Sequence, residues 1–298
     1  MTLATIINYC TNDYRFLGKC IEEARHFSDQ ILIPVCDHFF DEKPENRLLL
    51  DHTYAAHPDC QFIEFAYSSS KLYSPFLSCS PTDDEWPHLW HSTARTIGFL
   101  HVKPETEYVL FLDCDEIPDG KRMAEWLKTG EHRQWNALHL VAYFYVLRPH
   151  LRAKKLQENP LLARRSALET RLLLHPGERL GTYSSMPEPK KGQARGHDLL
   201  PLFHHYSWVR TEEECHQKAA TWAHRGEFDW PTLIRQTFRG NGNYFGSTHE
   251  FEEIPDVYFD PLSVPIPTEF THFGSFPHVK KVCSRDIFKM EIRDLACR

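Results

Sequence analysis

The chain has 298 residues, and its 34 Lys and Arg against 41 Asp and Glu give a formal net charge of −7 with histidine neutral. Hydrophobic residues make up 41% and aromatic residues 13%, which is too large a share for a disordered chain. The mild acidity argues against binding nucleic acid or anionic lipid through bulk charge, although it leaves room for a local basic groove that holds a phosphorylated ligand.

The sequence also argues against membrane-spanning and secreted classes. No run of 18 apolar residues occurs, and the longest candidate, Leu138 to Leu147, contains His139 and is too short to cross a bilayer. The N-terminal residues lack the basic start of a signal peptide, and the nine cysteines are scattered without a C-x-x-C pair. No structural zinc site is expected, because His88 and His91 have no cysteine pair nearby. We expect a soluble, cytoplasmic protein without a transmembrane segment, for which peripheral membrane contact stays open.

The first half of the chain alternates strand and helix patterns. Short apolar runs predict buried strands at Leu3–Tyr9, Ile31–Val35, Phe62–Ala66 and Tyr108–Leu112. Apolar residues at helical spacing predict the helices between them, at Tyr14–Phe27, about Glu45–Ala56, and Leu89–Leu100. Strands separated by helices imply right-handed crossovers, and therefore an α/β fold with a mainly parallel, doubly wound sheet flanked by helices.

Beyond residue 120 the pattern becomes irregular. Ala137 to Leu147 is strand-like, whereas Arg148 to Arg165 is basic and is expected to be irregular, because it carries Pro149 and Pro160. Thr170 to His175 is a short candidate strand, and Met186 to His197 combines Pro, Gly and Lys in the manner of a mobile basic loop.

A helix start is clear at Thr211. Glu214 follows at the third helical position, which makes a capping box and predicts a helix to about Arg225. No linker interrupts the chain, so we expect one domain over residues 1–298. Within this domain, residues 1–120 and residues 121–298 are expected to have different functions.

The strongest chemical signal is YVLFLDCDEIPDG, residues 108–120. A buried strand delivers Asp113, Asp115 and Glu116 at its carboxyl end, where open α/β sheets bind ligands. Three carboxylates in four residues repel one another and need positive charge, most simply a hard divalent cation of the kind that grips a diphosphate. The alternative is a solvated acidic turn that caps the helix starting near Gly120.

The ordered set of motifs resembles the GT-A fold of nucleotide-sugar-dependent glycosyltransferases. The opening TIINYCTNDYRFLGKCIEEARHFSDQILIPVCD and the later HSTARTIGF (91–99) resemble family 2 of these enzymes, and LDCDEIP and HHYSW (204–208) are similar to family 17. The resemblance covers about residues 3–120 well, is patchy to about 225, and is absent beyond. It implies a nucleotide-sugar-binding first half and an acceptor-binding second half.

The resemblance also implies roles for single residues. Asp115 would be the direct ligand of Mn²⁺ or Mg²⁺, and Asp113 would contact the metal, through water, or the ribose. Asp37 would hydrogen-bond the nucleobase or ribose, and Arg95 would face the nucleotide. The segment DHFFDEKPE after the second strand departs from the Ser/Thr-rich loop usual in family 2, which affects the expected base-binding details.

A third metal ligand and a catalytic base are predicted from the second half. His205 is the candidate ligand, since many GT-A enzymes complete the metal shell with a late histidine; the alternative is an imidazole packed in the core. A transfer with inversion needs a general base, and Glu227 or Asp229, next to Phe228 and Trp230, are the candidates because aromatic neighbours raise a carboxylate pKa. The donor is expected to be a UDP- or GDP-sugar, and the acceptor a glycan or a lipid-linked saccharide.

Two further functions stay open at this point. A haloacid-dehalogenase-type phosphatase also carries D-x-D after a buried strand, but its fold begins with that strand and its motif continues with Thr or Val where this chain has Ile117. A catalytically inactive nucleotide- or carbohydrate-binding protein on the same scaffold is the other alternative, because fold alone does not define activity. No Gly-rich phosphate loop of a nucleotidyltransferase occurs near the N-terminus.

Overall fold

A computed structural model describes the chain except for residues 67–85, 176, 241–243, 271–274 and 283–298. The first half builds a parallel sheet in the strand order β3-β2-β1-β4. Its strands are β1 (Leu3–Asn8), β2 (Gln30–Cys36), β3 (Gln61–Phe65) and β4 (Tyr108–Asp113). The four predicted strands are therefore confirmed, as is the α/β fold class.

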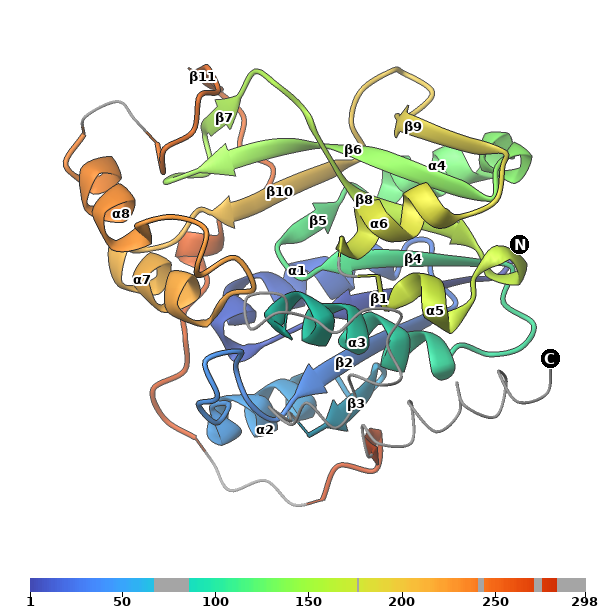
Figure 1. The fold of residues 1–298 in the computed structure, drawn as a ribbon, viewed down its shortest axis with the longest axis horizontal. Coiled ribbons are helices and arrows are strands. Elements are labelled where there is room, and N and C mark those ends of the chain that lie inside the picture. The colour runs from blue at the N-terminus through green and yellow to red at the C-terminus, as the bar shows by residue number, and fades with distance from the viewer. Residues whose placement is uncertain (67–85, 176, 241–243, 271–274, 283–298) are drawn as a thin grey trace.

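Helices cover both faces of this sheet, as the alternating side chains of β1 require. Leu3 and Ile7 belong to the core shared with α1 (Tyr14–Ala24) and α2 (Arg47–Ala56). Ala4 and Ile6 belong to the core shared with α3 (Trp86–Leu100). Figure 1 shows α3 in front of the sheet, on the same side as two short helices, α5 (Thr170–Leu173) and α6 (Glu178–Ser185).

The second half extends the same sheet. The long strand β6 (Ala137–Val146) is reached through β8 (Gln157–Arg164), which runs antiparallel to both β4 and β6. β10 (Phe203–Trp208) lies parallel to β6 and pairs on its other side with the short β5 (Glu116–Pro118). The remaining strands are β7 (Leu151–Ala153), β9 (Lys190–Ala194), β11 (Phe251–Glu253) and β12 (Val279–Val282).

Three helices complete the second half: α4 (Gly120–Thr129), α7 (Glu212–Thr221) and α8 (Trp230–Phe238). The predicted capping box is confirmed, since the Thr211 hydroxyl accepts from the Glu214 amide and the Glu214 carboxylate accepts from the Thr211 amide. The helix ends at Thr221 rather than near Arg225. No helix in the described part of the chain is long and apolar enough to cross a membrane.

Three local predictions are wrong. The segment Arg148–Arg165 contains the strands β7 and β8. Pro160 is tolerated within β8 because it lies just outside the residues paired with β4 and at an irregularity in the pairing with β6, where its missing N–H costs no hydrogen bond. The segment Met186–His197 contains β9, which pairs with β6, and Thr170–His175 contains the helix α5. Tertiary pairing outweighs the local turn residues in the two strand-forming segments.

Candidate functional site

A cavity of about 480 Å³ opens at the carboxyl ends of β1, β2 and β4. These strand ends contribute Asn8, Cys36 and Asp113 to its lining, and α3, α6, β10 and α7 contribute His91, Glu178, His205 and Lys218. The size lies within the range of about 300–1,000 Å³ that is typical of small-molecule sites. The predicted acidic cluster therefore faces a cavity and is not a solvated surface turn.

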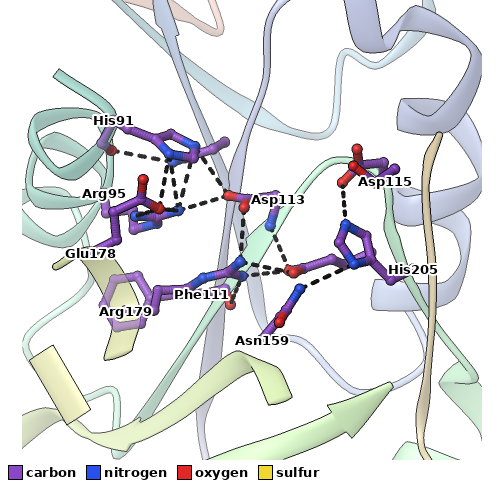
Figure 2. Close-up of polar contacts among 12 residues, drawn as sticks. His91, Arg95, Phe111, Asp113, Asp115, Asn159, Glu178, Arg179 and His205 are labelled. Atoms are coloured by element: carbon purple, nitrogen blue, oxygen red, sulfur yellow. Dashed lines mark hydrogen bonds and ion pairs between the residues drawn. The ribbon is translucent and has the colours of Figure 1, made fainter. Parts of the chain in front are cut away.

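Asp113 is held by cations on both carboxylate oxygens (Figure 2). Its Oδ1 accepts from Arg95 Nη2 at 2.9 Å and lies 3.3 Å from His91 Nε2, and its Oδ2 accepts from Arg179 Nη2 at 2.8 Å. Burial by itself would raise the pKa of Asp113, but Arg179, Arg95 and His91 hold that pKa well below its usual value. Asp113 is therefore an ionised carboxylate with fixed orientation.

His91 extends this network to a second acidic group. Its Nδ1 lies 3.1 Å from Glu178 Oε2, while its Nε2 faces Asp113. Burial and the neighbouring Arg95 would lower the pKa of His91, but Glu178 and Asp113 together raise that pKa to about 9. The imidazole is therefore a cation at neutral pH.

Asp115 has a separate set of partners. Its Oδ2 accepts from Lys218 Nζ at 2.7 Å and from Arg210 Nη2 at 3.3 Å, and its Oδ1 lies 3.5 Å from His205 Nε2. Burial would raise the pKa of Asp115, whereas Lys218, His205 and Arg210 hold that pKa well below its usual value. Figure 2 shows Asp115 and His205 pointing toward each other, away from the Asp113 network.

Glu116, the third acidic residue of the motif, is completely buried beneath the site. It accepts from Arg179 Nη2 at 2.8 Å and from the Asp113 amide at 2.9 Å, so it positions both Arg179 and the start of the acidic turn. The positive charge that the sequence predicted at this turn is thus supplied in part by Arg95, Arg179, Arg210 and Lys218. Of these four, only Arg95 was identified from the sequence.

The geometry around His205 fits a divalent cation next to Asp115. His205 Nδ1 lies 2.7 Å from Gln157 Oε1, which can only accept, and 3.1 Å from Asn159 Nδ2, which can only donate. In the tautomer that donates to Gln157, at the shorter of the two distances, the proton is on Nδ1 and the lone pair is on Nε2. That lone pair faces the free oxygen of the Asp115 carboxylate, and two such donors prefer a cation between them. Asp113, also predicted as a metal ligand, does not fit this set, since Arg95, His91 and Arg179 engage its oxygens.

The predicted nucleotide-contacting residues Asp37 and Arg95 lie next to residues that line the cavity, but neither of them is itself part of the described lining. Asp37 follows β2, and its Oδ1 lies 2.8 Å from Nδ1 of His38, which lines the cavity together with Cys36. Arg95 is almost completely buried, with a side chain 3% exposed, and contacts Asp113 and Glu178. Its guanidinium group is therefore held between two carboxylates of the site.

The two carboxylates predicted as base are placed differently from expectation. Asp229 caps the N-terminus of α8, and its hydrogen bonds to Thr232 lower its pKa. The expectation that aromatic neighbours raise the Asp229 pKa is wrong. Phe228 is largely exposed to solvent, and Trp230 packs into the hydrophobic cluster between α7 and α8. Glu227 is half exposed and contacts His224 Nδ1 at 2.5 Å.

The missed residues left little signal in the sequence. Lys218 lies seven positions after the Thr211 cap on the predicted helix, so it was visible only as an ordinary helix residue. Arg179 and Arg210 lie in segments without clear periodicity and reach Asp113 and Asp115 across 66 and 95 positions. The basic residues of the segments Arg148–Arg165 and Met186–His197 are not among the described residues that line the cavity: Arg164, Arg165, Lys190, Lys191 and Arg195.

No protein-family model and no curated protein matches the sequence. Among solved structures, TarS 1–349 of S. aureus in complex with UDP-GlcNAc is similar with a TM-score of 0.41 and 10% identity, covering 81% of this chain and 75% of that chain. Glucosyl-3-phosphoglycerate synthase from Mycobacterium tuberculosis, with Mn²⁺, UDP and phosphoglyceric acid, has a TM-score of 0.35 and 14% identity, covering 87% and 88%. The 4-diphosphocytidyl-2C-methyl-D-erythritol synthase from Anaerococcus prevotii has a TM-score of 0.39 and 8% identity, covering 73% and 97%. These likenesses are too weak to assign a family.

Proposed function

We propose that the protein is a metal-dependent glycosyltransferase of the GT-A type. It would move a sugar from a UDP- or GDP-sugar to a hydroxyl group of a glycan or lipid-linked saccharide, with inversion. The observation that carries this proposal is the pair of Asp115 Oδ1 and His205 Nε2, which lie 3.5 Å apart at the cavity. Asp115 follows the buried strand β4, and His205 lies in β10. Strand carboxyl ends are where open α/β sheets bind nucleotides.

Asp115 and His205 are the residues that would hold Mn²⁺ or Mg²⁺, and the bound cation would supply positive charge to a diphosphate. Lys218, whose ammonium group contacts Asp115 on the cavity wall, adds a second positive charge for the departing diphosphate. Asp113, oriented by Arg95 and Arg179, is proposed to position the ribose, and Asp37 is proposed to lie at the nucleobase end.

The phosphatase alternative is less well supported by the same geometry. A nucleophilic aspartate in the first position of D-x-D needs a free oxygen for attack on phosphorus. In this structure Arg95 and Arg179 each hold one oxygen of Asp113, and the cationic His91 lies beside it. In addition, β4 is preceded by three strands of the same sheet.

Thermal unfolding with UDP and GDP, with and without Mn²⁺, tests the proposal. We expect one nucleotide to stabilise the protein only when Mn²⁺ is present, by about 2.7 kcal/mol at a hundredfold excess over Kd. Asp115→Asn and His205→Ala should weaken this effect, whereas the exposed His197→Ala should not. Release of UDP or GDP from nucleotide sugars then separates an active enzyme from an inactive binding protein. Absence of stabilisation by any nucleotide in folded protein contradicts the proposal.

A further inference from the structure

We propose that His88, His224 and Glu227 form a second cation site, suited to Zn²⁺ or a similar transition metal, beside the Asp113 network. One ligand atom from each residue lies within 4.8 Å of the other two. His88 comes from α3, whereas His224 and Glu227 lie between α7 and α8, and both histidines line the cavity. The inference does not rest on the proposed transferase function.

Glu178 orients the His88 imidazole. Nδ1 of His88 lies 2.9 Å from Glu178 Oε1, so the carboxylate accepts and the Nδ1 atom carries the proton. The lone pair of His88 is then on Nε2, which faces Glu227 Oε1 at 3.9 Å. A carboxylate that fixes the tautomer of an imidazole in this way is the usual partner of a metal-binding histidine.

The backbone at Glu178 also supports its role in orienting His88. Glu178 begins α6 with a φ of 51°, in the left-handed region that non-glycine residues rarely adopt. Its carboxylate contacts His88, His91 and Arg95, and these contacts keep it aimed toward the cluster. The His88 and His224 rings meet edge to face, with centroids 4.5 Å apart.

The segment that carries His224 is also anchored. The Trp230 indole N–H donates to the His224 carbonyl at 2.9 Å, and the Trp222 ring packs on the His224 ring with centroids 4.4 Å apart. Glu227 Oε1 lies 2.5 Å from His224 Nδ1, so a cation would replace the proton that this pair now shares. The backbone that carries His224 is therefore held in place next to the other two ligand groups.

Two imidazoles and one carboxylate form a donor set that favours Zn²⁺ over Mg²⁺. Ligand atoms about 2.0–2.1 Å from a tetrahedral zinc lie about 3.3 Å apart. His88 Nε2 and Glu227 Oε1, now 3.9 Å apart, would therefore approach each other, whereas Glu227 Oε1 and His224 Nδ1, now 2.5 Å apart, would separate to admit the cation. Three protein ligands leave a fourth position for water or an oxygen atom of a bound molecule. On this assignment Glu227 is a metal ligand rather than the general base that the sequence suggested.

Metal content after dialysis against limiting Zn²⁺ tests the site, with the full chain first stripped by chelator. We expect one Zn²⁺ that is lost, or bound at least tenfold more weakly, in His88→Ala, His224→Ala and Glu227→Gln. Glu178→Gln should weaken binding about 10- to 100-fold, because it removes the carboxylate that orients His88 but none of the three ligands. Replacement of Zn²⁺ by Co²⁺ should give the strong visible absorption of a tetrahedral cobalt site in the wild-type protein and not in these variants.

Two controls separate this site from others. His197→Ala removes an exposed imidazole and should leave the Zn²⁺ content unchanged, which excludes a general loss of surface binding. Asp115→Asn should keep Zn²⁺ binding while it loses Mn²⁺-dependent nucleotide binding, so each proposal can fail without the other. Glu227→Gln changes a half-exposed side chain and tests the site even where a histidine variant does not fold. Equal Zn²⁺ affinity in wild type and Glu227→Gln, together with folded His224→Ala that retains the metal, overturns the assignment.

Discussion

Arg179 is the residue on which the acidic turn depends most directly. Its guanidinium group is buried and binds both Asp113 and Glu116. Arg179→Met should lower the free energy of unfolding by about 3–5 kcal/mol, because it leaves two buried carboxylates without their main partner. Urea unfolding at pH 7 measures the loss.

The matched control is Arg25→Met. Arg25 binds Asp59 with two hydrogen bonds, but both side chains are about half exposed. We therefore expect a loss of less than about 1 kcal/mol. Comparable losses in the two variants would show that the Arg179 contacts do not stabilise the folded state.

His139 gives the protein a predictable response to acid. It is 4% exposed, its ring stacks on Tyr183, and burial with the nearby Arg179 lowers its pKa to about 4. The folded state therefore binds a proton less readily than the unfolded chain, whose histidine pKa is about 6.5. The contribution of the neutral His139 to the free energy of unfolding is therefore complete above pH 6.5. It is lost as the pH falls from 6.5 toward 4, by at most about 1.4 kcal/mol per pH unit.

His139→Phe should reduce the loss of stability between pH 7 and pH 5, measured by urea unfolding at both values. Carboxylates with lowered pKa, such as Glu178, act in the same direction but mainly below this window. An equally steep pH dependence in the variant would assign the effect to other groups.

At the scale of secondary structure, α7 brings Lys218 to Asp115 and begins with the Thr211 capping box. Thr211→Ala removes the acceptor for the Glu214 amide and should destabilise the protein by about 1 kcal/mol. Thr211→Ser keeps the hydroxyl and should be close to wild type. Thermal unfolding of the two variants side by side checks this, and indistinguishable midpoints would contradict it.

At the scale of the whole molecule, residues from the second half complete the site of the first. Arg210 binds Asp13, Arg15 binds Glu214 at 2.7 Å, and Asn12 donates to Thr221 at 2.8 Å. β8 pairs with β4 through Leu161–Arg164, opposite Tyr108–Phe111. The two halves predicted from the sequence therefore share one sheet and one set of ion pairs.

A fragment of residues 1–120 should not fold on its own. It would leave one edge of β4 unpaired and would remove Arg179, Arg210 and Lys218 from the four carboxylates that they contact. Circular dichroism during urea titration should show no cooperative transition for the fragment and a clear one for the full chain. A fragment that unfolds cooperatively and binds nucleotide would contradict this expectation.

The local sequence by itself determined the first four strands, the helices between them, and the acidic turn that follows β4. These features depend on hydrophobic periodicity and on the residues at a strand end, which are properties of short segments. The tertiary structure alone decided which cations meet the carboxylates of the acidic turn, since Arg179 and Arg210 lie 63 to 95 positions from the residues of that turn which they contact. It also decided that Pro160 lies within a strand and that Glu178 joins His88 and His91, because pairing and packing between distant segments, rather than local preference, set those positions.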